Sequence, residues 1–201
     1  MKILGIVCSP RLHGNTEMMV QEALAKAQEK GAEIELITLA GKTISPCDAC
    51  RSCHKTGKCH IKDDMESLCD KMVEADGIIF GTPVYVYAMT GQAKTLMDRM
   101  LPLSVPSRSL ASKVGGVIVV AGSIGLIDPA KDFYFMMVMK KMVPANLVAV
   151  YASNKGDARE MKQGMQAAHN LGREMVQIAA KKFTYPDGFP RSFFAYGTHT
   201  H

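Results

Sequence analysis

Apolar residues fall into short continuous runs that alternate with stretches of helical spacing. The runs predict five strands, at residues 3–8, 33–39, 77–81, 113–121 and 146–151. Between them, apolar positions recur every three or four residues, as on the buried face of a helix; one such set is Met65, Leu68, Cys69, Met72 and Val73. Strands that alternate with helices predict an α/β domain with a parallel sheet covered on both faces.

Polar residues at the ends of these patterns indicate where the helices begin. Asn15 is expected to cap a first helix that runs to Lys30, and Thr90 to cap another. A helix is expected over part of residues 130–142, and a long one from Asp157 to about Lys182. The ordered part of the chain therefore predicts one domain, residues 1–182.

Two segments do not fit the alternation. Residues 40–63 show no periodicity, which is unusual in a compact domain unless the segment has a function or is fixed by other means. Residues 183–201 form a tail that is rich in aromatic side chains, and such a tail is expected to pack on the domain or on a second subunit.

Composition narrows the class of protein. Of 201 residues, 47% are hydrophobic and 21% charged, which is enough for a real core. No run approaches the roughly 20 apolar residues of a membrane span, and no signal-peptide pattern precedes the first strand, so we expect no membrane partner and a cytoplasmic location. The net charge of +5 is spread along the chain without a basic stripe, so a nucleic-acid partner is not expected.

The loop after the first strand has the chemistry of a phosphate site. It joins a strand to a helix N-terminus, where free backbone N–H groups and the helix dipole favour an anion. The candidate binding residues are Ser9, Arg11, Gly14, Asn15 and Thr16. The sequence matches neither the P-loop nor the dinucleotide fingerprint, and an ordinary strand–helix loop remains the alternative.

Two further loops should leave the same edge of the sheet. The loop after the third strand offers Pro83, Val84 and Tyr85 to a flat ligand, and Tyr87 is expected to be partly buried. The loop after the fourth strand contributes Gly122 and Ser123, which allow close approach to a ring.

Four cysteines occur within thirteen residues of the irregular segment, at Cys47, Cys50, Cys53 and Cys59. The surrounding residues are polar and give thiols little apolar surface to pack against. Successive gaps of two residues are typical of loops that bind iron–sulfur clusters, and one [4Fe-4S] cluster would use all four thiols. Zinc, with His54 or His60 as a substitute ligand, and a redox-active thiol loop are the alternatives. Cys8 and Cys69 are expected to be core residues.

These motifs resemble two related families. The segment Ser-Pro-Arg-x-x-Gly-Asn-Thr at residues 9–16, residues 81–85, and Lys94 with Asp98-Arg99 are similar to the flavodoxin-like NAD(P)H-dependent FMN reductases. A four-cysteine insert after the second strand of such a chain resembles the iron–sulfur flavoproteins. The resemblance implies a doubly wound, five-stranded sheet of order 2-1-3-4-5, FMN in the three loops and a [4Fe-4S] cluster in the insert.

The same resemblance implies the function. We expect an oxidoreductase that transfers electrons between cluster and flavin, with no catalytic side chain, from a ferredoxin-like donor to a small oxidant such as a quinone, oxygen or peroxide. It also implies a homodimer or homotetramer with the cluster close to a flavin across the subunit contact. The alternatives are an NAD(P)H-dependent FMN or quinone reductase with an empty or zinc-binding cysteine loop, and a non-catalytic flavin- or zinc-binding interaction protein.

Overall fold

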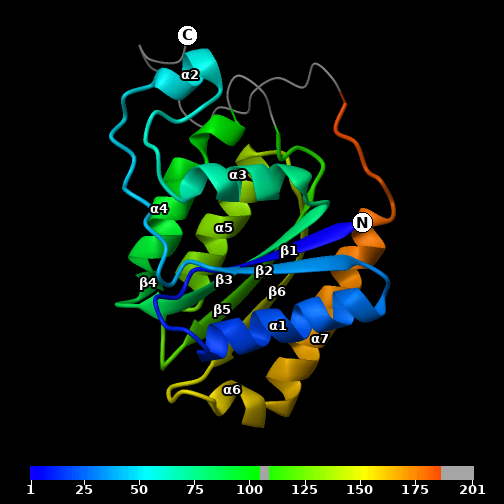
Figure 1. Ribbon diagram of the computed structural model, residues 1–201. Helices are drawn as coiled ribbons and strands as arrows, with labels where there is room; N and C mark the ends of the chain where they lie inside the picture. Colours follow the sequence, from blue (N-terminus) through cyan, green and yellow to red (C-terminus); the bar gives the residue numbers. More distant parts are fainter. Residues whose placement is uncertain (105–108, 187–201) are drawn as a thin grey trace.

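The computed structural model describes residues 1–104 and 109–186, which form a three-layer α/β structure around one sheet (Figure 1). Five parallel strands lie in the order β2-β1-β3-β5-β6. Their bounds are β1 Lys2–Val7, β2 Glu33–Thr38, β3 Gly77–Tyr85, β5 Val114–Ala121 and β6 Val143–Tyr151. The short β4, Ala88–Met89, pairs antiparallel with the end of β3 and lies off this path. With β4 set aside, the expected order 2-1-3-4-5 is confirmed.

Helices cover both faces of the sheet, as the continuous apolar strands require. One face carries α1 (Asn15–Glu29) and α7 (Lys162–Ala179), and the other carries α3 (Met65–Glu74), α4 (Gly91–Arg99) and α5 (Ile127–Met139). Three short helices complete the described chain: α2 Ser52–Thr56, the 3-10 helix η1 Leu101–Leu103, and α6 Asp157–Glu160.

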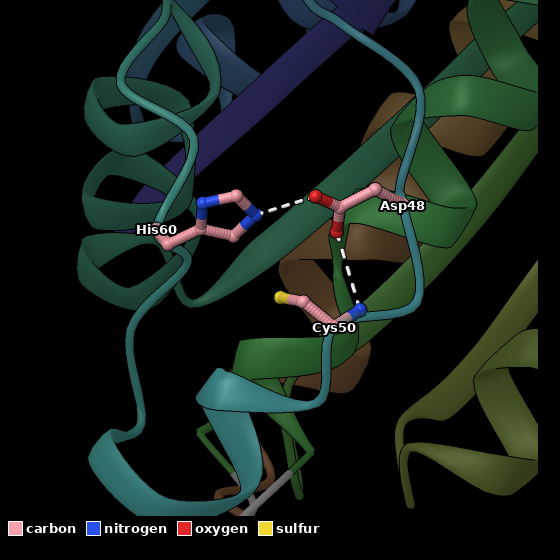
Figure 2. Close-up of side chains that lie close together, drawn as sticks. All are labelled: Asp48, Cys50 and His60. Carbon is pink, nitrogen blue, oxygen red and sulfur yellow. Dashed lines mark hydrogen bonds and ion pairs between the residues drawn. The ribbon is translucent and has the colours of Figure 1, made fainter.

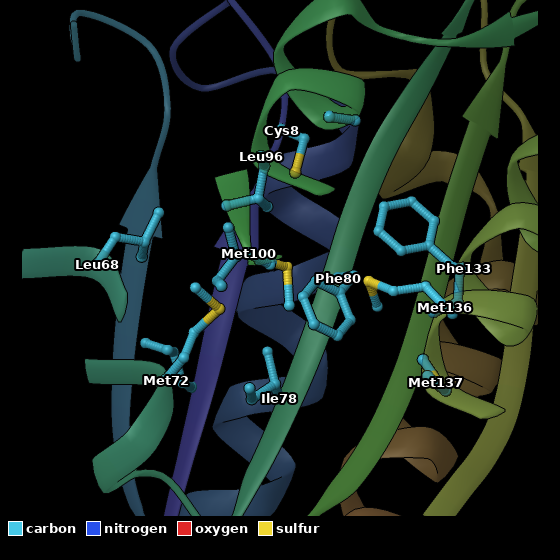
Figure 3. Packing of buried hydrophobic residues seen from close by; sticks show 14 of the residues in the cluster. Cys8, Leu68, Met72, Ile78, Phe80, Leu96, Met100, Phe133, Met136 and Met137 are labelled. Carbon is cyan, nitrogen blue, oxygen red and sulfur yellow. The ribbon is translucent and has the colours of Figure 1, made fainter. Parts of the chain in front are cut away.

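Each face of the sheet has its own hydrophobic core. Under α3, α4 and α5 the core is rich in methionine, and the rings of Phe80 and Phe133 stack with centroids 5.3 Å apart (Figure 3). Cys8 is fully buried in this core and Cys69 packs at its edge, which confirms that both cysteines are packing residues. Soft, flexible methionine side chains fill the irregular gaps between three helices that cross the sheet.

The structure corrects several boundaries. Gly14, and not Asn15, is the residue before α1, and no side chain caps that helix. Thr90 does cap α4, since its Oγ1 accepts the Ala93 N–H at 3.1 Å. The expected long C-terminal helix is two helices, because the backbone leaves helical geometry at Met161.

Other differences concern the loops. The α5 helix begins at Ile127, three residues before the predicted range, and α2 lies inside the segment expected to be irregular. The side chain of Tyr87 is 62% exposed rather than partly buried, because Tyr87 sits at the tip of the β3–β4 hairpin.

The start of the aromatic tail packs on the domain. The rings of Phe183 and Tyr185 meet edge to face at 5.0 Å, and the Tyr185 N–H donates to Ser112 Oγ at 3.1 Å. The rest of the tail, residues 187–201, lies outside the described residues, so its packing stays a prediction. Within residues 1–104 and 109–186, no helix combines the length and apolarity that a membrane crossing needs.

Candidate functional site

The first predicted binding loop is rigid and connects β1 to α1. Ser9 is buried, and its Oγ accepts the Arg11 N–H at 3.1 Å, while Arg11 itself is exposed. His13 has a left-handed backbone with φ of 54°, and the buried Glu17 carboxylate accepts its N–H at 2.6 Å. Because no side chain caps α1, the N–H groups of its first turn are available to an anion. The loop therefore fits a phosphate group.

Glu17 holds the first loop in place, a role that the sequence pattern did not single out. It occupies the third position of α1, and its carboxylate accepts an N–H from the loop before the helix. A capping box uses the same kind of bond, from a side chain early in the helix to the preceding backbone. Its second oxygen lies 3.2 Å from His13 Nδ1. The spacing of an acidic residue three positions into a predicted helix is the signal that points to this role.

Asn15 connects the first loop to the loop after β6. Its side-chain N–H groups donate to the carbonyls of Ala152 at 3.3 Å and Asn154 at 2.7 Å. Its Oδ1 accepts the N–H groups of Gly156 at 2.9 Å and Ala158 at 3.3 Å. The side-chain amide of Asn15 is thus engaged in holding two loops together, while its backbone N–H remains in the first turn of α1.

The second and third loops meet at the same edge. Val84 and Tyr85 lie at the end of β3, and the hairpin continues through Val86 and Tyr87 with φ of 46° and 69°. Gly125 lies against this hairpin so closely that a Cβ there would come within 2.9 Å of the Tyr87 Cα. Such contacts fix the hairpin next to the loop that contains Gly122 and Ser123.

These loops expose apolar side chains around the predicted ring site. Exposed groups include Tyr85, Val86, Tyr87 and Ile124. The Gly122 carbonyl accepts the Ser153 hydroxyl at 2.6 Å, which fixes the base of the third loop. A rigid anion-binding turn beside an apolar, aromatic rim fits a ligand that has a phosphate at one end and a flat ring at the other.

The four insert cysteines gather in the segment around α2. Left-handed residues bend the chain there, at Ala49, Arg51 and Gly57. Cys47 and Cys50 are exposed, Cys53 is buried and Cys59 is half-buried, and all are free thiols. Burial is the main cause that raises the pKa of Cys53, and charge on the other three cysteines raises it further.

Figure 2 shows a second set of donors that shares Cys50 with this group. The His60 Nε2 lies 2.7 Å from Asp48 Oδ2, and Asp48 Oδ1 accepts the Cys50 N–H at 3.2 Å. Ligand atoms of Asp48, Cys50 and His60 all lie within 4.8 Å of one another. Four thiols in one short segment fit the donor type and number of an iron–sulfur cluster, whereas the set whose ligand atoms lie close together, Asp48, Cys50 and His60, suits zinc.

A buried ion pair holds the two ends of the insert together. Arg99, at the end of α4, donates from Nη1 to Asp63 Oδ2 at 2.7 Å and from Nη2 to Asp63 Oδ1 at 2.9 Å. The same guanidinium donates to the carbonyls of Ser45 at 2.6 Å and Ile61 at 3.4 Å. Residues 45 and 61–63 flank the cysteines on both sides, so Arg99 closes the loop that carries them.

The cysteine insert and the predicted flavin loops lie at opposite ends of α4 (Figure 1). At the first end, the Thr90 hydroxyl donates to the Cys8 carbonyl at 2.6 Å, beside the first loop. At the other end, Arg99 holds the insert. Nine helical residues at about 1.5 Å each separate these two ends by about 13 Å.

The fold and these loops define a class of protein, the flavodoxin-like flavin oxidoreductases, and comparisons with known proteins agree. The family model for NADPH-dependent FMN reductases matches residues 1–157. Among solved structures, a flavone reductase superposes with a TM-score of 0.72 at 29% identity, covering 90% of this chain and 63% of that one. An archaeal flavodoxin gives 0.60 at 20% identity, covering 90% and 99%, and shows the fold alone.

The sequence relatives are more specific. An iron-sulfur flavoprotein of Methanocaldococcus jannaschii is 38% identical over 188 residues, or 89% of this chain and 97% of that protein. One from Archaeoglobus fulgidus is 32% identical, covering 91% of this chain and 82% of that protein. The chain belongs to the NADPH-dependent FMN reductase family and, within it, to the iron-sulfur flavoproteins.

Proposed function

We propose that this protein transfers electrons between a [4Fe-4S] cluster and FMN. The observation that supports the proposal is the presence, on one domain, of a strand–helix loop with an uncapped helix N-terminus and of a closed insert with four free thiols. When bound, the cluster exchanges electrons one at a time and the flavin singly or in pairs, so together they connect one-electron with two-electron chemistry.

The chain's own residues bind and orient the two groups. The first turn of α1, with Ser9 and Arg11, would hold the FMN phosphate, and Pro83, Val84 and Tyr85 would line the ring. Cys47, Cys50, Cys53 and Cys59 would ligate the cluster as thiolates. In this mechanism no side chain acts as a nucleophile.

We further propose a ferredoxin-like donor and a small oxidant such as a quinone, oxygen or peroxide. Protein-to-protein delivery of single electrons suits the cysteine insert, because Cys47 and Cys50 lie at the surface of the domain. All six cysteines are free thiols, which is consistent with a reducing cytoplasmic location.

The positions of the two sites support a homo-oligomer. Within one subunit the insert and the predicted flavin loops are separated by the length of α4, so a second subunit would bring a cluster closer to a flavin than one subunit does. We therefore propose a homodimer or homotetramer in which the insert of one subunit faces the flavin loops of another. Exposed apolar groups around those loops, such as Tyr87 and Ile124, would be covered in such a contact.

The test is anaerobic purification followed by visible spectra and analysis of iron, acid-labile sulfide, zinc and FMN. We expect flavin and four iron atoms per chain. Cys53→Ala should lose the iron and keep most of the flavin, whereas Cys69→Ser, the matched control, should keep both. Colourless, iron-free protein after reconstitution, or zinc at the thiols in its place, would refute the proposal.

The electron donor is tested separately. Reduced ferredoxin should bleach the wild-type flavin quickly, and Cys53→Ala should slow this bleaching strongly. Fast bleaching by NADPH that is equal in wild type and Cys53→Ala would instead favour direct NADPH use, the activity in the name of the matching family.

A further inference from the structure

Arg99 has one N–H group that its bonds to Asp63, Ser45 and Ile61 do not use. The side chain is 1% exposed, and its four hydrogen bonds to these residues all come from Nη1 and Nη2. Its Nε is buried and meets no hydrogen-bond acceptor within residues 1–104 and 109–186. A buried donor without an acceptor is unfavourable, so this N–H is available to an acceptor that binds next to it.

The guanidinium is held between the two ends of the cysteine insert. It donates to the carbonyl of Ser45, two residues before Cys47, and to the carbonyl of Ile61, two residues after Cys59. Together with Asp63 these acceptors bind both Nη atoms and fix the position of the guanidinium. The fixed cation therefore lies next to the segment that carries the four cysteines.

We propose that Arg99 sets the reduction potential of the cluster by holding its buried positive charge, with one unpaired N–H group, against the cysteine insert. This proposal rests on the proposed function, since it assumes that the thiols hold a cluster. Uptake of one electron adds one negative charge at this site and breaks no bond in the protein. A buried cation with a free N–H donor stabilises the more negative state, and it therefore raises the potential.

The experiment compares Arg99→Gln and Arg99→Lys with Lys94→Gln, which removes an exposed charge from the same helix. An EPR-monitored redox titration gives the cluster potential for each variant. We expect Arg99→Gln to disfavour reduction about tenfold, a shift of about 59 mV toward negative potential for one electron. Arg99→Lys keeps the charge but lacks the Nε–H, so it should shift less, and Lys94→Gln should match wild type.

A purely structural role for Arg99 gives a different result. In that case the Arg99 variants lose iron, but the clusters that remain titrate at the wild-type potential, and this outcome overturns the proposal. Iron and sulfide are measured first in wild type. Their absence there refutes the proposed function itself, whereas their presence with an unchanged potential in the variants refutes only the role of Arg99.

A second measurement covers the case in which the Arg99 variants retain no cluster. Protein labelled with ¹⁵N at arginine guanidinium groups is reduced and examined by pulsed EPR, in a variant with Arg51→Lys, Arg108→Lys and Arg191→Lys. Of the other arginines, Arg11 lies in the loop between β1 and α1, and Arg159 and Arg173 lie in α6 and α7, on the face of the sheet opposite α4. A ¹⁵N coupling to the cluster supports the proposal, and its absence overturns it.

Discussion

Gly172 of α7 faces the carbonyl oxygen of Ala23 on α1 so closely that a Cβ at Gly172 would lie 1.9 Å from that oxygen. A separation this short is far inside van der Waals contact. The two helices can therefore pack on the sheet at this distance only because position 172 has no side chain. This contact fixes α1, whose first turn belongs to the predicted phosphate loop.

Gly172→Ala should destabilise the fold. The added methyl group meets backbone atoms, which cannot move aside without separating α1 from α7, so we expect a loss of about 1–3 kcal/mol in the free energy of unfolding. Urea unfolding monitored by circular dichroism measures it. Gly91→Ala is the matched control, because a Cβ there meets nothing within 4 Å, and it should be neutral or slightly stabilising. Equal stability of Gly172→Ala and wild type would contradict the packing described.

Asp63→Asn should destabilise the fold by leaving the Arg99 charge buried without its partner. Breaking a buried ion pair in this way costs about 3–5 kcal/mol. The same unfolding experiment applies, with Asp98→Asn as control. Asp98 pairs with Lys94 at the surface, so its loss should change stability by less than about 1 kcal/mol.

The Asp63 carboxylate should also make stability depend on pH. Burial by itself raises the pKa of Asp63. The pKa is nevertheless lowered below 3.8, because the carboxylate accepts hydrogen bonds from Arg99 and from the N–H groups of Ser45 and Met65 and lies beside the Arg99 charge. Because the folded pKa is the lower one, the contribution is present above about pH 5 and is lost as pH falls through 3.8 toward the folded pKa. The fall in unfolding free energy below pH 5 should be smaller in Asp63→Asn. Identical pH profiles would show that Asp63 does not carry this dependence.

Asn15→Asp should weaken FMN binding and spare iron. The carboxylate adds a negative charge near the phosphate, and it cannot donate to the carbonyls of Ala152 and Asn154. We expect at least a tenfold rise in the dissociation constant of FMN, measured by flavin fluorescence, together with lower thermal stability of the flavin-free protein. Asn146→Asp, whose side chain accepts only its neighbour's N–H, is the control. Unchanged FMN affinity would show that the phosphate lies elsewhere.

The cysteines should differ sharply in reactivity. Burial raises the pKa of Cys8 and of Cys69 to about 12, so both stay protonated at pH 8, while Cys47 and Cys50 are exposed. In folded protein from which iron has been removed, maleimide should label Cys47 and Cys50 first and Cys8 and Cys69 only after unfolding. Mass spectrometry of timed samples follows the order. Early labelling of Cys69 would contradict its place in the core.

The sequence by itself determined the strands, most of the helices and the group of four thiols. These features depend on residues that are close along the chain: apolar periodicity sets which face of an element is buried, and short cysteine gaps place thiols within reach of one centre. The cap at Thr90 was predicted for the same reason, since a cap contacts residues within its own first turn.

Only the tertiary structure decided what Asn15 and Arg99 do. The sequence predicts that Asn15 caps the first helix. Its side chain instead forms hydrogen bonds with residues 137 to 143 positions away, and it makes no capping bond. Arg99 belongs to a motif in the sequence. Its role in holding the two ends of the insert together depends on hydrogen bonds to residues 36 to 54 positions away. Contacts across such separations are set by how helices pack on the sheet, so they cannot be predicted from local periodicity. The same packing places the thiols at the far end of α4 from the predicted flavin loops.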